Sequence, residues 1–170
     1  METRPELGTF ADPRDGKEYK TVKIGGQVWL AENLNWEGAG AWCNDNPAMG
    51  ARYGRLYTWD EAMRAAPPGW HLPTDEEWAA LTDFAGGAEN AAEALKSRDW
   101  DGADELGFSA LPGGYRYCDG VFYLVGTSGD WWSATEKDSE YACSRNIFGT
   151  KVCRNGGYKG RSFSIRLVRD

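Results

Sequence analysis

The feature that most limits the fold of this chain is its second half, where short β-forming segments alternate with glycine or aspartate turns. After Lys96 these segments are "FSALPGGYRY", "GVFYLVG", "DWWSATE", "EYACSRNIF", "TKVCRN" and "RSFSIRLVRD". Such spacing predicts short antiparallel strands joined by tight turns. The 22 glycines and the 14% aromatic content fit a loop-rich fold, in which glycines form the turns and wide rings fill a small core. A helical bundle is therefore disfavoured.

The first half predicts a hairpin and a loop. In "GKEYKTVKIGGQVWLAENL", β-forming residues flank Gly25-Gly26, which is a hairpin turn signal. The following "WEGAGAWCNDNPAMGARYG" is rich in glycine, asparagine, aspartate and proline, and this composition predicts a loop.

Helices are predicted next. Thr58 caps a short helix, "WDEAMRAA", which Pro67-Pro68 ends. The clearest local signal is "PTDEEWAALTDFAGG", in which Thr74 and Glu77 form a capping box. A helical stripe follows, made of Trp78, Leu81, Thr82 and Phe84, and "AENAAEALKS" predicts a further helix. Hairpin, loop, two helices and a meander of strands predict one α+β domain spanning residues 1–170.

The charge distribution excludes some functions. The net charge of −7 argues against general binding to nucleic acid, which needs basic surfaces. No apolar run is long enough to span a membrane, and "METRPELGTF" lacks the apolar region of a signal peptide. Residues 142–170 nevertheless carry seven Lys or Arg against one acid. Either this basic segment folds back on the acidic body, or it meets an acidic partner.

Residues for common catalytic and cofactor sites are scarce. His71 is the one histidine, which argues against a histidine-based metal site or catalytic triad, and we expect it to be structural. The segment "GVFYLVGTSG" lacks the Lys-Ser/Thr of a phosphate-binding loop. The asparagines of "NDNPAMG" lack the alternating acids of a calcium loop and favour a turn. We therefore expect no cofactor and no metal.

The four cysteines, Cys43, Cys118, Cys143 and Cys153, show no C-x-x-C spacing. If strands 141–146 and 150–155 pair around a turn at 147–149, Cys143 lies directly opposite Cys153, with Cβ atoms about 4.5–5.5 Å apart. A cross-strand disulfide and two free thiols both fit this arrangement, and a catalytic thiol pair is a third alternative.

Several phrases together resemble a known bacterial family. They are "GTFADPRDGKEYKTVKIGGQVWLAENLN", "YGRLYTWDEAM", "PPGWHLPTDEEWAALTDFAGG", "LGFSALPGGYR", "WWSATE" and "SFSIRLVRD". They are similar to the Fibrobacter succinogenes major paralogous domain family. The resemblance implies a C-type-lectin-like fold, related to formylglycine-generating enzymes and to the variable proteins of diversity-generating retroelements. It also implies a secreted or cell-surface location.

Two sets of features are missing from this chain. The calcium-dependent sugar-binding signatures of true C-type lectins are missing. Places where family members often carry cysteine read "AMGARYG", "APPGWHLP" and "IRLVRD" here, so that Cys43 has no obvious disulfide partner.

The C-terminal segment carries the functional hypothesis. Between the family's framework residues lie Cys143, Ser144, Ile147, Phe148, Gly149, Thr150, Cys153, Gly156, Gly157, Tyr158, Gly160 and Arg161. All belong to the types that adenine randomisation of Asn codons yields in retroelement-diversified proteins. We expect a non-enzymatic binding domain for an unidentified protein or surface ligand, with an acidic ligand as one alternative. Its predicted contact residues are Ser144, Asn146, Phe148, Thr150, Asn155, Tyr158 and Arg161.

Two alternatives to a binding domain remain. One is a formylglycine-generating type of enzyme that uses Cys143 and Cys153. The other is a structural cell-surface paralogue with no specific ligand.

Overall fold

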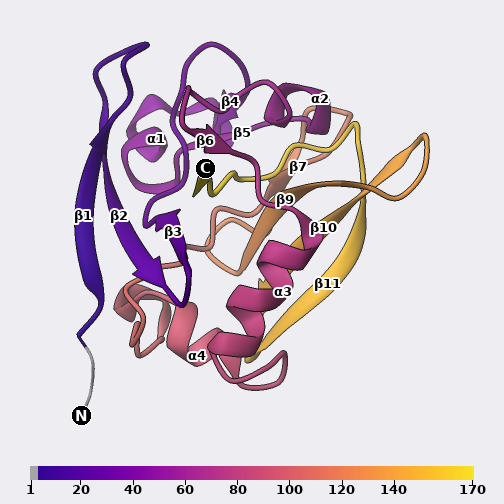
Figure 1. Ribbon diagram of the computed structural model, residues 1–170. Helices are drawn as coiled ribbons and strands as arrows, with labels where there is room; N and C mark the ends of the chain where they lie inside the picture. The colour runs from indigo at the N-terminus through magenta and orange to yellow at the C-terminus, as the bar shows by residue number, and fades with distance from the viewer. Residues whose placement is uncertain (1–3) are drawn as a thin grey trace.

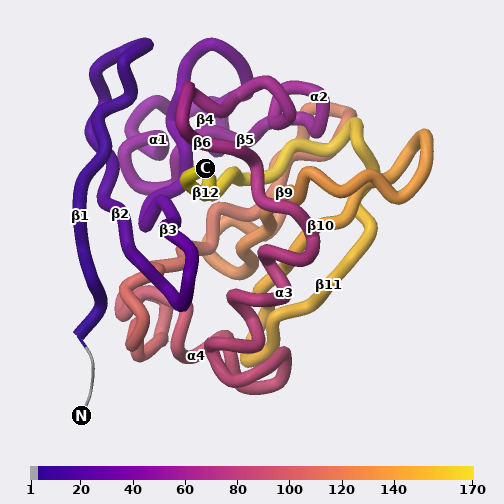
Figure 2. The backbone as a smooth tube through the Cα atoms, viewed as in Figure 1, coloured from indigo at the N-terminus to yellow at the C-terminus, as the bar shows by residue number. Residues whose placement is uncertain are grey.

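The computed structural model describes residues 4–170 and combines helices with antiparallel sheets, which confirms the predicted α+β class (Figure 1). The largest sheet has the order β1-β2-β3-β12-β6. Its strands are β1 (Glu6–Ala11), β2 (Glu18–Ile24), β3 (Gln27–Leu30), β12 (Val168–Arg169) and β6 (Trp70–His71). The last strand thus lies between two early ones, and the end of the chain lies beside β6 (Figure 2).

The predicted first hairpin is confirmed. Ile24 of β2 pairs with Gln27 of β3, so that Gly25-Gly26 form a two-residue turn. Gly25 has a φ of 59°, which glycine adopts at low cost and which turns of this kind require. Val22 and Trp29 are fully buried, so the hairpin directs one face into the core.

A second, three-stranded sheet contains the C-terminal segment. Its strands, in the order β11-β10-β9, are β9 (Ser128–Glu136), β10 (Tyr141–Phe148) and β11 (Lys151–Tyr158). Two small hairpins accompany it, β4 (Ala41–Trp42) with β5 (Arg55–Leu56), and β7 (Tyr115–Arg116) with β8 (Phe122–Tyr123). Strands β7, β8 and β12 are therefore shorter than the β-forming segments that predicted them.

The three predicted helices form, and two of them begin at the predicted caps. They are α2 (Trp59–Ala62), α3 (Asp75–Phe84) and α4 (Ala91–Leu95), of which α4 has no side-chain cap. Thr58 and Thr74 each form a complete capping box, with Glu61 and Glu77 respectively. Helix α2 is only four residues long, so that the prediction for "WDEAMRAA" was too long. Phe84, at the end of the predicted stripe on α3, is 58% exposed.

The loop predicted over residues 36–54 is wrong in part. It contains β4, a 3₁₀ turn (Cys43–Asp45) and helix α1 (Pro47–Tyr53). The Asn46 side chain accepts a bond from the Ala48 amide at 3.0 Å, and proline at the first helical position is favourable. A Cβ on Gly50 would lie 2.4 Å from the Trp42 ring, so glycine allows this helix to pack closely.

Two neighbouring tryptophans of β9 belong to different clusters of the hydrophobic core. Trp131 packs toward α3, with its ring centroid 6.2 Å from that of Trp78. Trp132 belongs to a different cluster and lies 4.2 Å from the Phe163 ring. This alternation follows from the pleat of the strand. Strand β9, at the edge of the three-stranded sheet, is thus covered by core residues on both faces.

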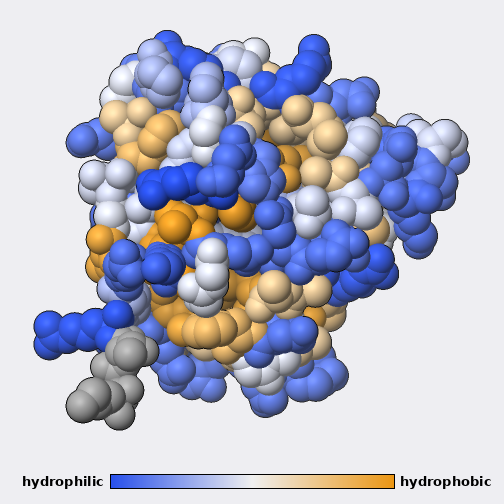
Figure 3. Space-filling view, viewed as in Figure 1, coloured by the Kyte–Doolittle hydropathy of each residue, from blue (hydrophilic) through white to orange (hydrophobic). Residues whose placement is uncertain are grey.

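The surface of the molecule carries both hydrophobic and hydrophilic residues (Figure 3). Figure 3 shows apolar residues over the region between β3 and α3, and a hydrophilic projection where β9 connects to β10. Within residues 4–170, no helix has the length and apolar character of a membrane span.

Candidate ligand-binding surface

The β10–β11 hairpin that carries the predicted contact residues has two different faces. Ser144 pairs with Asn155, and Phe148 pairs with Lys151. Since successive side chains of a strand point to opposite faces, Ser144, Asn146 and Phe148 share one face, and Arg145 lies on the other.

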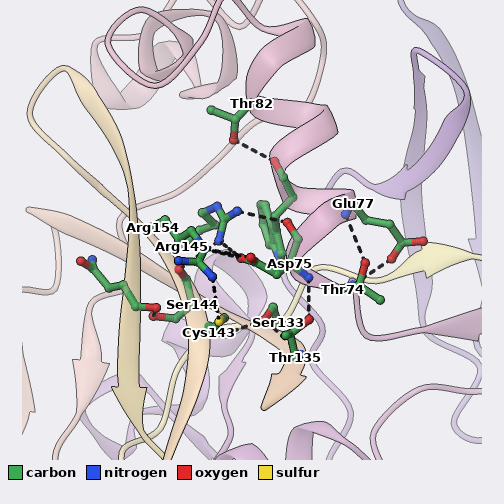
Figure 4. Close-up of polar contacts among 12 residues, drawn as sticks. Thr74, Asp75, Glu77, Thr82, Ser133, Thr135, Cys143, Ser144, Arg145 and Arg154 are labelled. Carbon is green, nitrogen blue, oxygen red and sulfur yellow. Dashed lines mark hydrogen bonds and ion pairs between the residues drawn. The ribbon is translucent and has the colours of Figure 1, made fainter. Parts of the chain in front are cut away.

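The face that carries Arg145 is closed by helix α3. Arg145 donates to Asp75 Oδ1 at 2.5 Å, and Arg154 donates to Asp75 Oδ2 at 2.8 Å (Figure 4). Arg145 is 4% exposed, while the side chain of Arg154 is 61% exposed. Burial alone would raise the pKa of Asp75, but the hydrogen bonds and charges of both arginines outweigh it and hold the pKa below its ordinary value.

One further bond joins α3 to the sheet, and another joins β9 to β10 beneath it. The Asp75 amide donates to Thr135 Oγ1 at 2.9 Å, and Ser133 Oγ donates to the Cys143 carbonyl at 2.8 Å (Figure 4). All these groups satisfy one another, and Asp75 also occupies the first helical turn, where an acid is favourable. We therefore assign this face a structural role.

The predicted opposition of Cys143 and Cys153 is wrong. Cys143 pairs with Gly156, and Cys153 pairs with Asn146. The hairpin turns through the two residues Gly149 and Thr150 rather than through 147–149, and Gly149 has a φ of 65° that suits this turn. This shift of register places the two thiols on opposite faces of the hairpin.

All four cysteines are free thiols. The burial of Cys43 raises its pKa to about 11, so that thiol is held neutral beside the Gly113 carbonyl, to which it donates. A catalytic pair formed by Cys143 and Cys153 has no geometric basis.

The opposite face of the sheet is open and polar along β10 and β11. Asn146 Nδ2 donates to Ser128 Oγ at 2.7 Å and to Asp130 Oδ1 at 3.0 Å. Ser128 Oγ donates to Asp130 Oδ2 at 2.8 Å. Burial raises the pKa of Asp130 to about 6, although these hydrogen bonds and the charge of Arg161 partly oppose the shift. Phe148, at the end of this face, is 56% exposed.

A tyrosine hairpin borders this open polar face. Tyr115 and Tyr123 pair across β7 and β8 and stack with centroids 5.5 Å apart. Arg161 lies over two tyrosine rings, with Cζ 5.1 Å from the centroid of Tyr117 and 5.5 Å from that of Tyr115. Its Nε atom is buried and makes no hydrogen bond within the described residues. The guanidinium is thus positioned by aromatic contacts and keeps donor capacity.

We call this surface the open face. It consists of Tyr117, Tyr123, Asp130, Asn146, Phe148, Asn155 and Arg161. Three of these residues, Tyr117, Tyr123 and Asp130, did not emerge from sequence reasoning. The segment "GGYRYCDGVFY" indicates a hairpin, but no sequence pattern places it beside Arg161.

The structure separates the other predicted contact residues. Ser144 is 2% exposed, and its hydroxyl lies 3.5 Å from the Asn155 carbonyl. Thr150 lies in the exposed turn at the hairpin tip. Tyr158 pairs with Tyr141, on the face toward α3. Sequence position alone therefore grouped residues that the sheet distributes over two faces and a turn.

Most of the basic C-terminal segment folds back on the body, as one of the two interpretations predicted. Arg145 and Arg154 pair with Asp75, Lys151 with Glu89 and Lys159 with Glu136. Arg161, Arg166 and Arg169 make no ion pair within residues 4–170. Arg166 is fully buried and Arg169 lies over the Trp70 ring, whereas Arg161 borders the open polar face.

The fold and this surface define a small α+β domain that displays a polar, aromatic-edged sheet face. A family model described as the Fibrobacter succinogenes major domain matches residues 22–169. The chain therefore belongs to this family, as its motifs predicted. Searches of curated proteins and of solved structures gave no match.

Proposed function

We propose that this domain is a non-enzymatic binding module whose contact surface is the open face. The observation that carries the proposal is Arg161, which two tyrosine rings position and which makes no ion pair within residues 4–170. Tyrosine and arginine are the residue types that most often dominate binding energy at interfaces, and asparagines adapt around them.

The partner that fits is a protein or surface ligand that presents an acidic group to Arg161. A carboxylate of the partner can accept hydrogen bonds from the terminal Nη groups of Arg161, while apolar groups of the partner cover Tyr123, which is 40% exposed, and Phe148. The hydrogen-bonded strands beneath provide a rigid support.

We also propose the C-type-lectin-like fold and the location that the family resemblance implies. A C-type-lectin-like fold is supported by the pairing of β12 with β3 and β6, which brings the end of the chain beside its early strands. The family resemblance further supports a secreted or cell-surface location.

Diversification by a retroelement is a narrower version of the proposal. It is supported at Phe148, Thr150 and Arg161, whose side chains are exposed or half-exposed. It is opposed at Cys143, Ser144 and Ile147, which are at most 4% exposed, because random replacement of buried residues destabilises a core. Only the exposed subset is therefore proposed as variable. DNA sequencing beside the gene tests this through a near-copy of the codons for 141–161, accompanied by a reverse transcriptase gene.

The binding proposal is tested with a matched pair of tyrosine variants. Tyr123 and Tyr158 are 40% and 38% exposed, and only Tyr123 belongs to the open face. The labelled domain is applied to an array of acidic, neutral and basic peptides and to intact bacterial cells. We expect binding to acidic peptides or cells that Tyr123→Ser or Arg161→Gln weakens at least about 10-fold, and that Tyr158→Ser leaves unchanged.

Equal weakening by Tyr123→Ser and Tyr158→Ser would overturn the assignment of the open face. Absence of binding in every arm would favour a structural surface component. Circular dichroism of each variant separates loss of binding from loss of folding.

A further inference from the structure

Two adjoining cavities lie away from the open face. One has a volume of about 350 Å³ and is lined by Lys20, Glu32, Arg52 and Ser97 among others. The second has a volume of about 240 Å³ and is lined by Asn35 together with Glu32 and Arg52. Since they share Glu32 and Arg52, they form one groove, which we call the Arg52 groove. The larger cavity alone is within the range of small-ligand sites.

The rim of the Arg52 groove carries cations that make no ion pair within the described residues. Lys20, Arg52 and Arg98 are exposed, and none makes an ion pair within residues 4–170. Elsewhere the basic residues of the C-terminal strands mostly pair with acids. Three unpaired cations around one cavity favour an anionic ligand.

A buried charge beneath the groove acts in the same direction. Arg166 is fully buried and is held by neutral acceptors, among them Asn33 Oδ1 at 2.8 Å and the Ser109 carbonyl at 2.9 Å. The carboxylates whose charges reach it are Glu32 and Asp104, which line the larger cavity. The charged residues that line the two cavities balance, with Lys17, Lys20, Arg52 and Arg98 against Glu18, Glu32, Asp99 and Asp104. Arg166 beneath them therefore leaves the groove with a small positive excess.

The Arg52 groove also contains two unused polar atoms. Ser97 is 8% exposed, and its hydroxyl has no hydrogen-bond partner, although Ser97 directly precedes the 3₁₀ turn Arg98–Trp100. In the second cavity Asn35 Oδ1 is buried and has no partner. Unpaired buried polar atoms are costly and rare in native proteins, so both atoms are candidates to hydrogen-bond a group bound in the groove.

We propose that the Arg52 groove binds a small hydroxylated monocarboxylate, of the chemical class of a sugar acid. Its carboxylate lies against Arg52 and the neighbouring cations, and its hydroxyls satisfy Ser97 Oγ and Asn35 Oδ1. A single negative charge matches the small positive excess, whereas a doubly charged phosphate meets repulsion from Glu32, Asp99 and Asp104. The site is independent of the open face.

The test is a calorimetric titration with D-glucuronate, with D-glucose and D-glucose 6-phosphate as comparison ligands. We expect saturable binding of glucuronate and weaker binding of both others. Arg52→Gln should weaken glucuronate binding about 10-fold or more, since a charged hydrogen bond is lost. Ser97→Ala should weaken it about 2- to 10-fold, which is the effect of a neutral hydrogen bond.

The matched control is Arg64→Gln, an exposed arginine just after the end of α2 that lines neither cavity. It should leave the affinity for glucuronate unchanged, as should Tyr123→Ser on the open face. No saturable binding of glucuronate, equal affinity for glucose, tighter binding of glucose 6-phosphate, or an equal effect of Arg64→Gln each overturns the proposal. Arg52 is exposed, so its replacement tests the site without loss of the fold.

Discussion

Asp130 belongs to the open face, and its partial burial makes its charged form unfavourable for the stability of the fold. Burial raises its pKa to about 6 from an ordinary value of 3.8. The folded state therefore holds its proton at pH values where the unfolded state has already released it. It follows that the stability contributed by Asp130 decreases as pH rises from about 4 to 6.

We predict that Asp130→Asn makes the protein more stable at pH 7, by about 1–3 kcal/mol, because an amide carries no buried charge. The gain should shrink toward pH 4, where Asp130 is neutral in both states. Urea unfolding at a series of pH values measures this difference. Asp83→Asn, at an exposed position of α3, is the control and should show little change. A variant that is less stable at pH 7 contradicts the prediction.

His71 is a residue whose titration can be followed without ambiguity, because the sequence has one histidine. Its ring lies between Asp170 Oδ1, at 2.7 Å from Nδ1, and Glu77 Oε1, at 2.8 Å from Nε2. Burial lowers the pKa of His71, but the bonds and charges of Asp170 and Glu77 outweigh it and raise the pKa above 6.5. The expectation of a structural histidine agrees with these contacts.

We predict an NMR titration midpoint of His71 above 6.5, and a lower midpoint in Asp170→Asn. The stabilisation that His71 contributes is complete below pH 6.5 and is lost as pH rises through the raised pKa. The contribution is modest, because the His71 side chain is 36% exposed and solvent screens it. A midpoint at or below 6.5 in the wild type would show that the two carboxylates do not act on this ring.

At the scale of elements, the contact between α3 and the three-stranded sheet depends on Asp75. Replacing it leaves Arg145 buried without its carboxylate, and an uncompensated buried charge is strongly destabilising. We predict that Asp75→Asn lowers the free energy of unfolding by about 2–4 kcal/mol. Arg154→Gln should cost much less, since that side chain is mostly exposed.

The pH dependence separates this ion pair from a packing effect. The pKa of Asp75 is depressed, so its stabilisation is present above its ordinary pKa of 3.8 and is lost as pH falls below that value. Wild-type stability should therefore decline more steeply than that of Asp75→Asn in acid. Urea unfolding between pH 2.5 and 7 gives the comparison, and parallel curves would contradict an electrostatic role.

At the scale of the whole molecule, the fold is held together without disulfides. The register of β10 and β11 places Cys143 and Cys153 on opposite faces, and the buried Cys43 lies beside Gly113. We predict that the thermal midpoint is the same with and without a reducing agent. The measurement uses Cys118→Ser, because Cys118 is exposed and can join two molecules. A midpoint that drops on reduction would point to an internal disulfide.

Local signals predicted the elements whose determinants are close in the sequence. Thr74 and Glu77 are three residues apart and satisfy each other's backbone groups, so the start of α3 could be located from the sequence. The turn at Gly25-Gly26 is equally local. Helix α1 was missed although Asn46 and Pro47 are helix-start signals, because a short helix among glycines is stable only when packed, here with Gly50 against Trp42.

The sequence by itself determined the α+β class and the family, because the motifs that indicate them recur along the whole chain. It also determined the two capped helices and the hairpin turn, because these depend on residues close together in the sequence. Only the tertiary structure decided the register of β10 against β11, the place of β12 between β3 and β6, and the position of the tyrosine hairpin beside Arg161. These arrangements depend on packing between distant segments. A change of one residue in a turn, such as that at Gly149-Thr150, moves side chains to the opposite face.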